Sequence, residues 1–242
     1  MGFEDRDYSR ADYGRKRGWG GGLRMRALSV SMWLIILNVA VFLLDRVLER
    51  MGVQYILTTA AGRLAMPPLE GLGHFSVWTT IYHLQLWRFI TFQFLHANKE
   101  HLFFNMLAVY FFGPLLESYL GSRRFITFYL MCGVAGPIVY VILWSLGALG
   151  HGGAENWVPL VGASAGIFGI LIAAAQVAPD VMVLMMFIPM RLRTMAWVLL
   201  GIAVWVIFTG GANAGGQAAH LGGAVVGWVL IQRPQWLDWH LR

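Results

Sequence analysis

The sequence is poor in charge and in cysteine. Only 12 % of its 242 residues are Asp, Glu, Lys or Arg, whereas 58 % are hydrophobic. Because soluble domains carry about twice that share of charge, we assign the chain to the polytopic membrane proteins. Cys132 is the only cysteine, which excludes an intrachain disulfide and any metal site built from several cysteines.

Acidic residues are especially scarce in the second half of the chain. After Glu117 the sequence contains only Glu155, Asp180 and Asp238, and none of them lies inside an apolar run. No carboxylate is therefore available for a Ser-His-Asp triad within the membrane. The zinc motif His-Glu-x-x-His is also missing. We expect a site that uses no metal and no other cofactor.

Apolar runs dominate what remains. Several are short against the roughly 20 residues that a helix needs to cross a bilayer, which would fit a locally thinned membrane. They predict an all-α polytopic membrane protein. Its transmembrane domain is expected to contain six helices and to cover residues 28–232. The six predicted spans cover residues 28–44, 101–120, 125–149, 158–177, 194–208 and 217–232.

Two further segments are expected to stay outside the hydrocarbon. Residues 48–100 are interrupted by charges and by Pro67-Pro68 but are rich in aromatic residues, so we predict an outer loop at the headgroup interface. Residues 181–190 are apolar but end at Pro189 and Arg191. We place them in a loop at the inner surface.

The basic residues predict the orientation. Seven of the eighteen Lys and Arg lie in the first 26 residues, just before the first apolar run. We therefore interpret the net charge of +6 as a signal for membrane topology and not as a surface that binds nucleic acid. With the N-terminus inside, thirteen basic residues face the cytoplasm and five face outward. We expect a disordered basic tail over residues 1–27, a short tail over 233–242, both termini in the cytoplasm, and a bacterial plasma membrane.

Four polar residues in the apolar runs stand out because ionisable groups are costly in hydrocarbon. His101 and Asn105 lie one helical turn apart at the start of the second run, Ser164 lies in the fourth, and His220 near the start of the sixth. These three runs enter from the same side, so the four residues share a depth. A serine beside a histidine can become a nucleophile, and His101, Asn105 and the Ser164 amide could stabilise an oxyanion.

Glycines next to this serine and histidine favour close helix packing. Gly162 and Gly166 surround Ser164, and Gly223 and Gly227 follow His220. Small residues four apart let two membrane helices approach each other. Packing alone would also explain both pairs, but it leaves the histidine unexplained.

The chain resembles the rhomboid family of intramembrane serine proteases over about residues 28–232. The matching features are Gln85-x-Trp87-Arg88, His101-x-x-x-Asn105, Gly162-x-Ser164 and Ala219-His220-x-x-Gly223-x-x-x-Gly227. The resemblance implies a six-transmembrane-helix rhomboid-like bundle in which Ser164 attacks the peptide bond and His220 is the base. It also implies that His101, Asn105 and the Ser164 amide form the oxyanion hole.

The resemblance implies supporting roles as well. His96 would lie near the catalytic water, Glu117 in an inner hydrogen-bond network, and Trp87 and Arg88 in the outer loop. Substrates would be membrane-anchored proteins cut in or near their transmembrane segments. Two positions depart from the family pattern: Ala165 stands where many members have glycine, and Gln85 where many have glutamate.

Two other functional classes remain open. A catalytically silent rhomboid-like protein would bind membrane clients without cutting them, but such relatives typically lack the serine or the histidine, and this chain keeps both. A channel or transporter would need a polar path through the whole membrane. The polar cluster here stops in the outer third of the predicted spans.

Overall fold

The computed structural model describes residues 28–59, 62–149, 156–185 and 187–241. The proposed basic tail over residues 1–27 lies outside this range. Each predicted apolar run corresponds to one helix, so the prediction of a polytopic helical membrane protein is confirmed. The helices are α1 (Val30–Arg50), α4 (Lys99–Leu120), α5 (Ser122–Ser145), α6 (Ser164–Val177), α7 (Leu192–Phe208) and α8 (Ala214–Gln232).

Four of these helices, α1, α4, α5 and α8, are long and apolar enough to cross a membrane. Helices α6 and α7 are apolar but shorter, with 14 and 17 residues. The two largest errors in the predicted boundaries are at the end of α1 and at the start of α6. Helix α1 continues to Arg50, and α6 begins at Ser164 instead of residue 158 because residues 158–163 are not helical.

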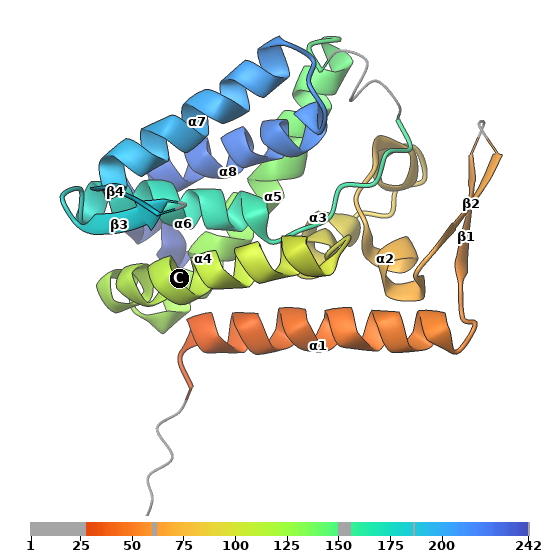
Figure 1. Ribbon diagram of the computed structural model, residues 1–242, viewed down its shortest axis with the longest axis horizontal. Coiled ribbons are helices and arrows are strands. Elements are labelled where there is room, and N and C mark those ends of the chain that lie inside the picture. Colours follow the sequence, from red (N-terminus) through yellow and green to blue (C-terminus); the bar gives the residue numbers. More distant parts are fainter. Residues whose placement is uncertain (1–27, 60–61, 150–155, 186, 242) are drawn as a thin grey trace, which may run out of the picture.

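The helices alternate in direction (Figure 1). Helices α4, α6 and α8 begin at one end of the bundle, beside the segment that joins α1 to α4, and we call this the loop end. Helices α1, α5 and α7 run the opposite way. Helix α8 packs mainly on α5 and α6, whereas α1 lies against α4 and α7 lies on α8. The centre is therefore formed by α5, α6 and α8.

Glycines allow α6 and α8 to pack closely. A Cβ atom on Gly223 would collide with the backbone carbonyl of Ala165, and one on Gly227 would meet the backbone of Gly169. The expectation that Gly162 and Gly166 form a pair on one helix face was wrong. Gly162 precedes α6 and has a φ of +127°, a conformation that favours glycine.

We predict that Gly223→Ala lowers the free energy of unfolding by about 2 kcal/mol, as overpacking typically does. The added methyl meets backbone, which cannot rotate away as a side chain can. Gly201→Ala is the matched control, since a Cβ at Gly201 on α7 has nothing within 4 Å. Thermal unfolding in detergent would measure both. Equal midpoints for the two variants would contradict the prediction.

The loop between α1 and α4 is ordered and contains several short elements. They are the antiparallel hairpin β1 (Tyr55–Thr59) and β2 (Gly62–Met66), helix α2 (Pro68–Gly73), a π-helix (Val77–Tyr82), helix α3 (Arg88–Thr91) and a 3₁₀ turn (Phe92–Phe94). Within this loop, α2, α3 and the 3₁₀ turn pack against α1, α5 and α6, whereas the hairpin projects away from the bundle (Figure 1).

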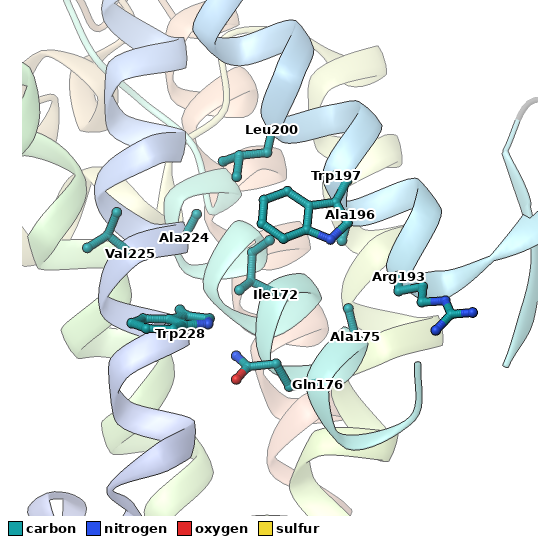
Figure 2. A pocket seen from close by; sticks show the side chains of 10 residues that line it. All are labelled: Ile172, Ala175, Gln176, Arg193, Ala196, Trp197, Leu200, Ala224, Val225 and Trp228. Atoms are coloured by element: carbon teal, nitrogen blue, oxygen red, sulfur yellow. The ribbon is translucent and has the colours of Figure 1, made fainter. Parts of the chain in front are cut away.

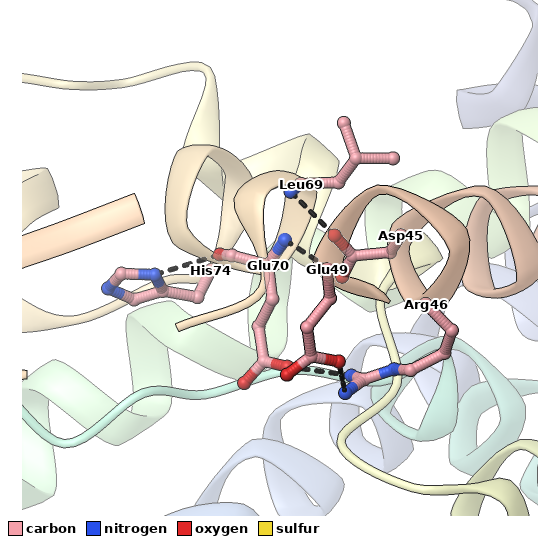
Figure 3. Close-up of polar contacts among 6 residues, drawn as sticks. All are labelled: Asp45, Arg46, Glu49, Leu69, Glu70 and His74. Carbon is pink, nitrogen blue, oxygen red and sulfur yellow. Dashed lines mark hydrogen bonds and ion pairs between the residues drawn. The ribbon is translucent and has the colours of Figure 1, made fainter. Parts of the chain in front are cut away.

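Polar contacts join the end of α1 to α2 (Figure 3). The buried Asp45 carboxylate accepts hydrogen bonds from the backbone N–H groups of Leu69 and Glu70, at 2.7 and 3.2 Å. It thereby satisfies donors at the start of α2 that have no partner within the helix. Arg46 forms ion pairs with Glu49 and Glu70 at 3.0 and 3.3 Å. These contacts fix the loop to the first helix.

The buried side chain of Arg88 links several parts of the same loop by hydrogen bonds. This side chain is 1 % exposed and donates to the carbonyls of His74 and Gly71 at 2.7 and 3.0 Å. It also donates to Gln85 Oε1 at 2.6 Å. Gln85, one of the two departures from the pattern that the resemblance implies, is therefore one of the hydrogen-bond partners of the guanidinium. The indole of Trp87 donates to the Leu72 carbonyl at 3.2 Å.

We predict that the contribution of His74 to the stability of this loop is lost as the pH falls, because His74 is buried as a neutral imidazole. Burial, reinforced by Arg88, lowers the pKa of His74 from 6.5 to about 4. Protonation thus favours the unfolded state: the stabilisation is full above about pH 6.5 and is lost as the pH falls towards 4. At pH 5 the loss from this group is about 2 kcal/mol.

Unfolding midpoints measured between pH 8 and pH 5 would test this dependence. His74→Asn keeps a donor for the Glu70 carbonyl, which His74 Nδ1 contacts at 2.9 Å, but removes the titrating group. We expect a shallower pH dependence in this variant than in the parent. An unchanged slope in His74→Asn would contradict the prediction.

Two segments at the opposite end from the loop also fold back. Most of the segment predicted as a loop and not a span, 181–190, corresponds to the two strands of a short antiparallel hairpin, β3 (Met182–Met185) and β4 (Ile188–Arg191). The C-terminal segment forms a 3₁₀ helix, η4 (Pro234–Leu241). Leu237 is fully buried and Asp238 pairs with Arg124 at 2.6 Å, so this short tail packs against α5.

Candidate active site

Ser164 is the first residue of α6. The preceding chain is held away from helical geometry by the loop. Leu160 forms backbone hydrogen bonds with Phe75 at 2.7 and 3.0 Å, and the Gly162 N–H donates to the Phe92 carbonyl at 2.9 Å. Because the first N–H groups of a helix have no acceptor within it, the Ser164 amide lies at a helix end that can bind negative charge.

The structure brings Ser164 and His220 together. Ser164 Oγ lies 2.9 Å from His220 Nε2, so the two side chains of α6 and α8 are hydrogen bonded. Phe168, one turn after Ser164, stacks on the imidazole with ring centroids 4.2 Å apart and planes 9° apart. The other ring nitrogen, His220 Nδ1, lies 3.1 Å from Gln217 Oε1 on the same helix.

His101 and Asn105 on α4 line the same cavity as the serine and histidine. The cavity has a volume of about 420 Å³. The Asn105 side chain is buried, and its Nδ2 has no hydrogen-bond partner among the described residues. A lining residue of the cavity thus carries a buried amide donor that has no acceptor among the described residues. The lining residues are Ala97, His101, Asn105, Pro159, Leu160, Val161, Ser164, Phe168, Asn213, Gly216 and His220.

His96 lies behind this cavity and does not line it. Its ring is 3 % exposed and packs edge-on against His101, with centroids 5.1 Å apart. Burial, with a smaller contribution from His101, lowers the pKa of His96 to about 3. The ring is therefore neutral at physiological pH, and neither nitrogen has a hydrogen-bond partner within the described part of the chain.

Trp87, Arg88 and Glu117, also singled out in the sequence, do not line the cavity. Trp87 and Arg88 belong to the loop described above. Glu117, near the end of α4, accepts hydrogen bonds from the N–H groups of Val30 and Ser31, both at 2.9 Å, and from Ser122 Oγ at 2.7 Å. It joins the start of α1 to the turn between α4 and α5, opposite the loop end.

Two residues beside the histidine were missed by sequence reasoning. Phe168 looks like any other apolar residue of its run, and only its spacing of four from Ser164 could have suggested a shared helix face. Gln217 precedes His220 by three residues, which also places them on one face. That spacing was a usable signal, because a glutamine is rare enough in such a run to be noticed.

A second hollow of about 400 Å³ lies between α6, α7 and α8 (Figure 2). Its walls are apolar and include Trp197 and Trp228, with Arg193 and Gln176 as the polar lining residues. It shares no residue with the serine cavity. Across the described ranges, no group of three His, Cys, Asp or Glu side chains is arranged to hold a metal ion.

Comparison with known proteins agrees with the resemblance. The family model of the Rhomboid domain matches residues 83–233, more than half of the chain. Rhomboid-like protein 11, chloroplastic, of Arabidopsis thaliana is 25 % identical over 207 residues, covering 82 % of this chain and 63 % of the relative. Rhomboid protein 1, mitochondrial, of Saccharomyces cerevisiae is 31 % identical over 142 residues, 55 % of this chain and 38 % of the relative.

A bacterial relative is also similar. The putative rhomboid protease YdcA of Bacillus subtilis is 38 % identical over 84 residues, 35 % of this chain and 39 % of the relative. The chain spans less than two thirds of the length of each of these three proteins. Two of the three relatives are named as chloroplast or mitochondrial proteins. The location of this chain in a bacterial plasma membrane therefore stays a prediction. The chain is an integral, multi-pass membrane protein and belongs to the rhomboid family.

Proposed function

We propose that the protein is an intramembrane serine endopeptidase that cleaves membrane-anchored proteins in or near their transmembrane segments. The observation that carries this proposal is the 2.9 Å contact between Ser164 Oγ and His220 Nε2. A serine hydroxyl alone is a weak nucleophile, and a neighbouring imidazole that accepts its proton activates it. Membership of a family that contains proteins named as proteases supports the same activity.

The arrangement accounts for each step of acyl transfer. As Ser164 Oγ attacks the scissile carbonyl carbon, its proton passes to His220 Nε2, and the carbonyl oxygen takes up negative charge. Asn105 Nδ2, His101 and the Ser164 N–H are donors on the wall of the cavity where this charge develops. His220 then gives its proton to the leaving amine, and the acyl-enzyme remains on Ser164 until it is hydrolysed.

A client-binding protein without catalysis is the alternative. It would not require a hydrogen-bonded serine and histidine, nor a donor such as Asn105 Nδ2 left without a partner in the adjoining cavity. Buried polar groups normally have partners, and exceptions are often functional. These two observations favour catalysis over binding alone.

Labelling with a serine-directed fluorophosphonate in detergent tests the proposal. We expect one label per chain, mapped by peptide mass spectrometry to Ser164, and no label in Ser164→Ala. Ser118→Ala is the control, because this exposed serine only donates to the carbonyl of Leu115 in its own helix. Equal labelling of the parent and Ser164→Ala would reject the protease assignment.

A further inference from the structure

His220 is held on three sides. Ser164 on α6 contacts Nε2, Phe168 on α6 covers one face of the ring, and Gln217 on α8 contacts Nδ1. Stacking fixes the plane of the imidazole but cannot choose which nitrogen carries the proton. That choice depends on the groups that face the two nitrogens.

The tautomer decides whether the histidine can act as a base. To accept the Ser164 proton, Nε2 must be unprotonated, so the proton of the neutral ring must be on Nδ1. Gln217 Oε1, at 3.1 Å, is an acceptor for that proton. If the glutamine presented its NH₂ group instead, the ring proton would be displaced to Nε2 and the serine would lose its acceptor.

We infer that Gln217 is a positioning residue that keeps His220 in the Nδ1–H tautomer through its side-chain oxygen. This inference rests on the proposed protease function and completes it. Gln217 occupies the place that an aspartate takes in a three-residue serine protease site. It does not line the cavity, so it acts through His220 and not on the substrate.

An amide suits this position better than a carboxylate would. Gln217 is half-buried on an apolar helix, where an ionised side chain is costly. A neutral amide fixes the tautomer and the ring orientation without bringing a charge into the membrane. The spacing of three residues on one helix places the amide one turn before the imidazole, so no other element is needed to support the contact.

Nitrogen NMR of ¹⁵N-histidine-labelled protein in micelles tests the inference without any substrate. The two neutral tautomers give distinct ring nitrogen shifts, and His220→Ala identifies the His220 signals by their loss. We expect the Nδ1–H form in the parent and in Gln217→Glu, which keeps an oxygen acceptor. Gln217→Met, which has a similar length but lacks a strong acceptor, should shift the population towards Nε2–H.

The rate of fluorophosphonate labelling provides the second readout. Gln217→Met should slow labelling of Ser164 about tenfold or more, which is the effect of removing the hydrogen-bond partner that orients a metal-bound histidine. Gln217→Glu should label at a rate close to that of the parent. Gln232→Met is the matched control on the same helix, where the side chain contacts Gln176 Oε1 at 3.2 Å. With a peptide-bond substrate, kcat should fall and KM should not change.

The outcomes separate this inference from the proposed function. An Nε2–H tautomer in the parent, or equal labelling rates in Gln217→Met and Gln232→Met, would overturn the role of Gln217 even if Ser164 is labelled. Failure of the parent to label at all would reject the protease assignment, and the NMR measurement would still decide the tautomer.

Discussion

His220→Ala is expected to lower the rate of substrate cleavage by roughly 10⁴- to 10⁶-fold, the range seen when a serine protease loses its base. Without Nε2 at 2.9 Å from Ser164 Oγ, the hydroxyl has no group that accepts its proton during attack. The measurement is cleavage of a single-span membrane protein in proteoliposomes, followed by gel electrophoresis. The fold should persist, since alanine fits wherever the larger ring did.

His83→Ala is the control for this experiment. His83 is exposed in the loop, and its Nδ1 contacts only the Trp78 carbonyl, at 2.8 Å. Its replacement should leave the cleavage rate within a factor of about two, as expected for a surface change. If His220→Ala cleaved at a rate close to that of the His83 control, a histidine base would be excluded.

Asn105→Ala is expected to lower kcat by about 10²- to 10³-fold, the usual effect of removing one oxyanion donor. The Nδ2 group is buried in the wall of the cavity and has no partner among the described residues, so it is free to bind the developing charge. KM should change little, because the interaction strengthens only in the transition state.

Asn38→Ala provides the matched comparison. Asn38 is also a buried asparagine in a transmembrane helix, but its amide donates to the Leu34 carbonyl of α1 at 2.8 Å, away from the cavity. We expect this variant to change the unfolding midpoint more than kcat. The oxyanion role would be refuted if Asn105→Ala behaved in the same way, with lower stability and an unchanged kcat.

Most of the helical architecture could be predicted from the sequence, because the bilayer imposes it. Backbone groups in hydrocarbon must be hydrogen bonded internally, so an apolar run of sufficient length predicts a helix. The start of α6 could not be predicted in this way. Residues 158–163 are as apolar as the helix that follows, and their departure from it depends on backbone hydrogen bonds with Phe75 and Phe92, far away in the chain.

The site was predictable to the extent that topology determines it. Ser164 and His220 could be paired because their runs enter from one side and because polar residues are rare there. The predicted start of the fourth span was wrong, because α6 begins at Ser164 and not at residue 158. The stacking of Phe168 on His220 joins two helices, and hydrophobic periodicity does not predict it. The contact of Gln217 with His220 lies within α8 and follows from their spacing of three residues.

The late start of α6 also bears on how the reaction obtains its second reactant. Fourteen helical residues rise only about 21 Å, against roughly 30 Å for a typical hydrocarbon core. Ser164 therefore begins a helix that is shorter than the hydrocarbon core, and it lines a hollow of about 420 Å³. A hollow of this size has room for water, so in the proposed reaction the water that hydrolyses the acyl-enzyme need not cross the bilayer.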